Sequence, residues 1–87
     1  MPNTVTIYTT PNCVACRQTK RQFDKLEVVY DSIDLSLHPE QAEIFREAGL
    51  LQAPIVIFGE RRWSGFRLEK IQSVAREIKA GVSKNEG

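Results

Sequence analysis

The sequence lacks the features of membrane-spanning, exported and nucleic-acid-binding proteins. Its longest apolar run, residues 53–58, contains Pro54 and is far too short to cross a bilayer. The opening residues 1–4 have neither the basic region nor the apolar stretch of a signal peptide. Twelve basic and eleven acidic residues leave a formal net charge of +1, too small to attract nucleic acid or an anionic membrane. We therefore expect a cytoplasmic protein with no membrane or nucleic-acid partner.

Cysteine and histidine are also scarce, because the chain has only Cys13, Cys16 and His38. Cytoplasmic thiols are kept reduced, and a bond between cysteines so close in sequence closes almost no loop, so stability is a poor reason for the pair. A structural zinc site needs a closed set of ligands, for which His38 is the only further good candidate. We therefore expect no metal, and redox chemistry becomes the main hypothesis for the cysteines.

Hydrophobic periodicity predicts alternating strands and helices in this chain of 87 residues. The expected strands are residues 4–9, 28–34, 55–58 and 61–64, and the expected helices are residues 14–27, 39–48 and 68–78. The order β-α-β-α-β-β-α is that of a minimal thioredoxin/glutaredoxin fold, an α/β fold with a four-stranded mixed sheet flanked by three helices. We expect a single domain at residues 1–80 and a flexible tail at residues 81–87.

The cysteine pair lies between a predicted strand and the start of a predicted helix. The unpaired N–H groups and partial positive charge of a helix N-terminus stabilise a thiolate at Cys13. Cys16 lies one turn along on the same face, within reach of a disulfide. We therefore expect Cys13 to attack a partner disulfide and Cys16 to break the resulting mixed disulfide. This context predicts a dithiol–disulfide oxidoreductase.

Three stretches of the sequence resemble the glutaredoxin-like NrdH-type redoxins. Residues 7–16 resemble the active-site segment, residues 51–57 the proline loop, and the string Trp-Ser-Gly-Phe-Arg at residues 63–67 is the most specific of the three. The resemblance implies a monomeric electron carrier with no cofactor beyond its redox-active Cys13–Cys16 disulfide. It also implies reduction by thioredoxin reductase and electron donation to the large subunit of class Ib ribonucleotide reductase.

The same resemblance implies a partner-binding surface beside the cysteines, with a cis peptide bond between Ala53 and Pro54. The partner-binding residues that it implies are Ala53, Pro54, Trp63, Gly65, Phe66 and Arg67. Core packing is an equal alternative for Trp63, and Arg67 is as well suited to organise the start of the last helix. The chain departs from the family at Leu68, where a proline is usual, and at Ala15, where glutamine is more common.

Two alternative functions remain open at the level of sequence. The first is a glutathione-dependent glutaredoxin, against which Thr10, Gln52 and Arg67 argue, because they stand where glutathione-binding members have other residues. The second is an arsenate-reductase-like regulator that binds RNA polymerase, since residues 8–17 resemble the opening of that family. Those regulators have an inserted helical region and lack the string at residues 63–67.

Overall fold

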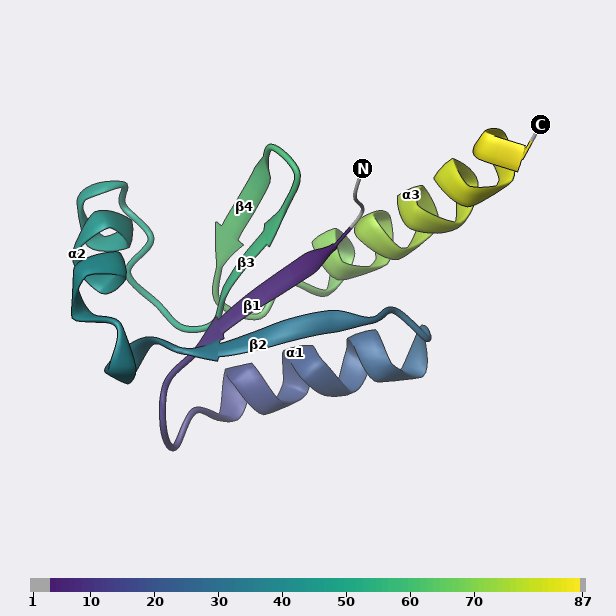
Figure 1. The fold of residues 1–87 in the computed structure, drawn as a ribbon. Coiled ribbons are helices and arrows are strands. Elements are labelled where there is room, and N and C mark those ends of the chain that lie inside the picture. Colours follow the sequence, from purple (N-terminus) through teal and green to yellow (C-terminus); the bar gives the residue numbers. More distant parts are fainter. Residues whose placement is uncertain (1–3, 87) are drawn as a thin grey trace.

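The computed structural model describes residues 4–86 as a mixed sheet with helices on both of its faces (Figure 1). The elements are β1 (Val5–Thr9), α1 (Val14–Lys25), β2 (Tyr30–Asp34), the short 3-10 helix η1 (Leu35–Leu37), α2 (Pro39–Glu47), β3 (Ile55–Phe58), β4 (Arg61–Ser64) and α3 (Leu68–Glu86). The predicted order of strands and α-helices and the predicted fold class are confirmed. Within the described residues, no helix is both long enough and apolar enough to cross a membrane.

The four strands lie in the order β2-β1-β3-β4. β1 is parallel to β2, because α1 carries the chain back across the sheet between them, and antiparallel to β3. β3 and β4 form a hairpin whose turn contains Gly59 at a φ of +61°. The register pairs Tyr8 near the end of β1 with Ile55 at the start of β3. The loop after β1 and the loop before β3 therefore leave the sheet at the same end of these two central strands.

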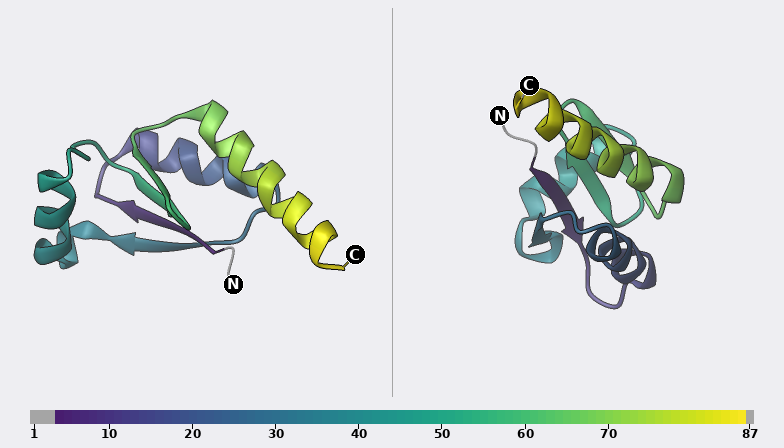
Figure 2. Two further views of the ribbon diagram at one scale, coloured as in Figure 1. Left: turned by 90° about the horizontal axis from the view of Figure 1, so that it is seen from above. Right: turned by 90° about the vertical axis from the view of Figure 1, so that its right-hand side faces the viewer.

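The larger core lies between the sheet and the pair of helices α1 and α3, which share one face in Figure 2. Side chains of successive strand residues point to opposite faces, so alternate positions such as Val5 and Ile7 of β1 face these helices. The buried members of this core are Val5, Ile7, Phe23, Val28, Val56, Phe58, Trp63, Ile71, Val74 and Ala75.

A smaller core lies on the other face, beneath α2. Its buried residues are Leu35, Phe45 and Ile55. The ring of Tyr8 packs edge-on against that of Phe45, with centroids 4.9 Å apart. This arrangement holds α2 close to the end of the central strands from which the two loops emerge.

Glycine and glutamate end the first two α-helices in the same way. After α2, Gly49 has a φ of +87° and the Leu50 N–H donates to the Phe45 carbonyl at 2.9 Å. After α1, Glu27 has a φ of +61° and the Val28 N–H donates to the Phe23 carbonyl at 2.9 Å. Both are Schellman-type ends. α2 ends at Glu47, close to the end predicted at residue 48, and α1 ends at Lys25, slightly earlier than the predicted residue 27.

Two features of the fold differ from the sequence-based expectation. η1 was not predicted; Asp34 caps it, because the amide and hydroxyl of Ser36 donate to the Asp34 carboxylate at 2.9 and 2.7 Å. These hydrogen bonds lower the pKa of Asp34. α3 continues to Glu86, past the end that we expected near residue 78. The flexible tail at residues 81–87 stays a prediction, and its last residue lies outside the described range.

Candidate active site

Cys13 is the N-cap residue of α1, at the end of the loop that follows β1. Its backbone is extended, with φ −111° and ψ 108°, and its Sγ accepts a hydrogen bond from the Cys16 N–H at 3.0 Å. A sulfur at this position faces the unpaired amides of the first helical turn, and that turn contains no acidic residue. The site therefore stabilises negative charge on Cys13.

Cys13 and Cys16 form a disulfide, with Cα atoms 5.2 Å apart. The two sulfurs differ in access: Cys13 is partly exposed, whereas Cys16 is 3% exposed and packs on the buried face of α1. A partner can therefore reach Cys13 from solvent, while the buried Cys16 is placed to attack Sγ of Cys13 once that sulfur carries the partner. This asymmetry fits the predicted division between an attacking and a resolving cysteine.

The proline loop and the turn after β4 are joined by main-chain contacts. The Ala53–Pro54 peptide bond is cis, as the resemblance implied. The buried Pro54 accepts a hydrogen bond at its carbonyl from the Gly65 N–H at 2.8 Å. Gly65 has a φ of +83°, and a Cβ added there would lie 3.1 Å from Oε1 of Gln52. The positive φ favours glycine at this position, and a Cβ there would also require the exposed end of the Gln52 side chain to shift slightly.

Trp63 belongs to the larger core and is 4% exposed. It pairs with Val56 in the register of the β3–β4 hairpin. Its Nε1 is buried without a hydrogen-bond partner among the described residues. The structure therefore favours the core-packing interpretation of Trp63 and leaves almost none of the ring for a partner to touch.

Phe66 and Arg67 lie on the surface at the start of α3. Phe66 is 36% exposed. Arg67 contacts the first-turn residue Glu69, with Nε 3.2 Å and Nη2 3.1 Å from the same carboxylate oxygen. The pKa of Glu69 is lowered by a hydrogen bond from its own main-chain amide and then by the one from Arg67. Arg67 thus organises the start of the helix, as the alternative interpretation held, while half of its side chain stays exposed.

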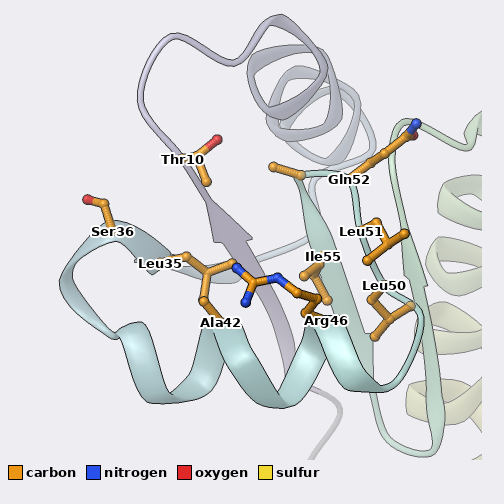
Figure 3. Close-up of a pocket in the computed structure, with 10 residues that line it drawn as sticks. Thr10, Leu35, Ser36, Ala42, Arg46, Leu50, Leu51, Gln52 and Ile55 are labelled. Atoms are coloured by element: carbon orange, nitrogen blue, oxygen red, sulfur yellow. The ribbon is translucent and has the colours of Figure 1, made fainter.

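Sequence reasoning missed a pocket of about 270 Å³ on the α2 side of the site (Figure 3). Its walls include Thr10 and Ala53, which flank the cysteine loop and the cis peptide bond, and Arg46 of α2. Leu51, directly before Gln52, is 71% exposed at this pocket. The sequence itself shows only that two leucines, Leu50 and Leu51, stand directly before Gln52 of the proline loop. Hydrophobic periodicity does not reveal which loop residues meet α2.

The described residues contain no group of three or more His, Cys, Asp or Glu side chains arranged to hold a metal ion. His38 is exposed at the N-cap of α2 and makes no capping hydrogen bond with its side chain.

A disulfide at the N-terminus of α1, next to a cis-proline loop on a sheet of this order, defines a thiol–disulfide oxidoreductase of the thioredoxin-like fold. The glutaredoxin family model matches residues 5–63. The glutaredoxin-like protein NrdH of Escherichia coli (strain K12) is 42% identical over 67 residues, which make up 77% of this chain and 83% of that protein.

NrdH of Lactococcus lactis subsp. lactis is 31% identical over 71 residues, 82% of this chain and 99% of that protein. The solved structure of the NrdH-redoxin from Escherichia coli superimposes with a TM-score of 0.77 at 40% identity, covering 80% of this chain and 92% of that chain. The chain belongs to the glutaredoxin family and is an NrdH-type redoxin.

Proposed function

We propose that this redoxin carries electrons in the cytoplasm, as a monomer, from thioredoxin reductase to the large subunit of class Ib ribonucleotide reductase. The observation that carries the proposal is the Cys13–Cys16 disulfide at the start of α1, with one accessible and one buried sulfur, in a chain similar to NrdH proteins. The disulfide is its only redox group, and no further cofactor takes part.

The reaction transfers two electrons and needs only the two sulfurs. The Cys13 thiolate attacks a disulfide of the partner and forms a mixed disulfide, releasing one partner thiolate. The Cys16 thiolate then attacks Sγ of Cys13, and the second partner sulfur leaves as a thiolate that takes up a proton. The partner is now a dithiol, and the redoxin is the disulfide seen here. Thioredoxin reductase returns it to the dithiol by the same exchange in reverse.

Three residues around the pair support thioredoxin reductase over glutathione as the reductant. Thr10 offers no positive charge for a carboxylate of glutathione. Arg67 brings a cation to the place where an acidic residue would bind the glutathione amine. Gln52 stands in the cis-proline loop where glutathione-binding members have another residue, and its amide oxygen lies against the Gly65 turn.

An NADPH-oxidation assay tests the reductant directly. The oxidised protein is offered either thioredoxin reductase or glutathione with glutathione reductase, each with a small disulfide as the final acceptor. We expect turnover with thioredoxin reductase and no rate above the protein-free control with glutathione. Equal turnover with both reductants would show a glutathione-dependent glutaredoxin instead.

A trapping experiment tests the electron acceptor. The Cys16→Ser variant cannot resolve a mixed disulfide, so it should accumulate as a covalent adduct with the ribonucleotide reductase large subunit through Cys13. Cys13→Ser is the matched control and should form no adduct, because Cys16 is buried. Absence of an adduct with Cys16→Ser, in a preparation whose Cys13 still forms a mixed disulfide with a small disulfide and releases one thiolate from it, would reject this acceptor.

A further inference from the structure

The pocket on the α2 side combines an apolar lining with a cation. Leu35, Leu50 and Ile55 form its apolar part together with the exposed Leu51. Arg46 is the one charged side chain among its lining residues, all of which lie in the described part of the chain. In Figure 3 Arg46 extends from α2 on the same side of the sheet as the leucines, whereas Gln52 points away from it. The pocket therefore suits an apolar group that has a negative charge next to it.

The pocket lies close enough to Cys13 to be filled by the same partner segment that reacts there. Thr10 lines the pocket and precedes Cys13 by only three residues, so their Cα atoms are at most about 11 Å apart. A residue two or three positions from the attacked cysteine of an extended segment lies about 7–10 Å away from it. The Thr10 wall of the pocket therefore lies within reach of a segment bound at Cys13.

The guanidinium of Arg46 is paired with a carboxylate that the carboxylate of a ligand can replace. It forms an ion pair with Glu43, one turn earlier on α2, and both side chains are more than half exposed, at 62% and 57%. Exposed pairs of this kind are weak. A carboxylate brought to the pocket by a bound segment can therefore take over the guanidinium, and its attraction would be limited by competition from Glu43.

From this geometry we propose that the pocket is a docking subsite for the disulfide-bearing segment of a protein substrate, and that it selects a leucine-like residue next to a carboxylate two or three positions from the reactive cysteine. The proposal rests on the proposed function, because it needs a protein disulfide at Cys13. The apolar side chain fills the space beside Leu51, and the carboxylate pairs with Arg46.

Synthetic peptide disulfides test the subsite without a natural partner. The first peptide is the symmetrical disulfide dimer of Glu-Leu-Ala-Cys-Ala-Leu-Glu, which presents the two residues on either side of the cysteine. The second has Gln in place of Glu, and the third has Gly in place of Leu. The protein is reduced with dithiothreitol and desalted, and the rate of peptide thiol release is measured under single-turnover conditions. We expect the first peptide to react fastest.

Variants of α2 then assign the preference to Arg46. Arg46→Gln should lower the rate ratio of the Glu peptide to the Gln peptide by as much as about fivefold, the upper limit for an exposed ion pair. Glu43→Gln should raise the same ratio, because it removes the competing carboxylate. The raised ratio should be lost when Glu43→Gln is combined with Arg46→Gln. Arg76→Gln, at an exposed position of α3, removes the same charge elsewhere and should leave the ratio unchanged.

Equal rates for the three peptides, or equal ratios in Arg46→Gln and Arg76→Gln, would overturn the subsite and leave the proposed function intact. Failure of the wild-type protein to reduce the peptides and hydroxyethyl disulfide alike would instead reject the proposed function. A wild-type dimer in sedimentation that Arg46→Glu dissociates would show that a second copy occupies the pocket, which would also overturn the proposal.

Discussion

Thr19 gives a quantitative test of how the site-bearing helix packs. It is fully buried on α1, on the same face as Cys16 and Phe23, and its Oγ1 has no hydrogen-bond partner among the described residues. An unpaired buried hydroxyl costs roughly 1–3 kcal/mol. Thr19→Val keeps the shape of the side chain, and the two residues have similar helix propensities. We therefore expect the free energy of unfolding to rise by about 1–2 kcal/mol in Thr19→Val.

A substitution of Thr19 that keeps the hydroxyl and removes the methyl group should lower the free energy of unfolding. Thr19→Ser keeps the hydroxyl and removes a buried methyl group, so the free energy of unfolding should fall by about 1 kcal/mol. For a domain of this size, a change of that magnitude moves the melting temperature by about 5 °C. The order of stability should therefore be Thr19→Val, then wild type, then Thr19→Ser.

Urea titration of the oxidised protein measures these differences, with the fluorescence of Trp63 as the signal, because it is the single tryptophan and is buried. Thr4→Val is the matched control, since Thr4 is exposed and the change should stay within about 0.5 kcal/mol. A loss of stability in Thr19→Val with an unchanged control would refute the reasoning. It would mean that the hydroxyl donates a hydrogen bond in the native helix, for which the Ala15 carbonyl is the natural acceptor.

Other positions give shorter tests. Gly65→Ala should lower the free energy of unfolding by about 1–3 kcal/mol in urea titrations, and by less in a Gln52→Ala background, which removes the contact with the new Cβ. Ser36→Ala should raise the pKa of Asp34 in an NMR titration, because it removes the hydroxyl hydrogen bond that is the largest cause of the lowered pKa. The stability from Asp34 is present above its unfolded pKa and lost as the pH falls through its folded pKa, so this variant and wild type should converge in acid. Trp63→Ala should cost about 3–5 kcal/mol, followed by circular dichroism.

The fold could be predicted because its elements follow local patterns. Alternation places Val5 and Ile7 on one face of β1, and Gly49 ends α2 through a positive φ. The misses have equally local causes. Glu27 ends α1 in a conformation that glycine usually supplies, and η1 depends on the side-chain cap of Asp34. Neither signal stands out from composition or hydrophobic periodicity.

The candidate site also has a part that the sequence could predict and a part that it could not. Cys13 and Cys16 could be predicted because their chemistry depends on spacing along one helix. The α2 pocket could not, because it joins residues from the loop after β1, from α2 and from the proline loop. Their meeting depends on the antiparallel pairing of β1 with β3 and on the packing of Phe45 against Tyr8. Such contacts are fixed by tertiary packing and leave no periodic trace in the sequence.

The string at residues 63–67, which carried the family resemblance, combines packing and surface residues. Trp63 is a core residue, and Gly65 binds the proline loop through its amide, so both are needed to hold the loop beside the cysteines. Only Phe66 and Arg67 present substantial surface to a partner. We infer that changes at Phe66 alter partner preference with little loss of stability, whereas changes at Trp63 remove the fold on which that preference depends.

Leu68 stands where the family usually has a proline, and α3 still begins at this residue. α3 begins at Leu68, and the first helical hydrogen bonds run from the amides of Lys70 and Ile71 to the carbonyl of Arg67. Proline is favoured at the first position of a helix because its amide would have no helical partner there. The amide of Leu68 is likewise not needed for the helical ladder, so either residue starts the helix at the same place. In this chain the turn that carries Phe66 and Arg67 is held to the proline loop by the hydrogen bond from the Gly65 amide to the Pro54 carbonyl.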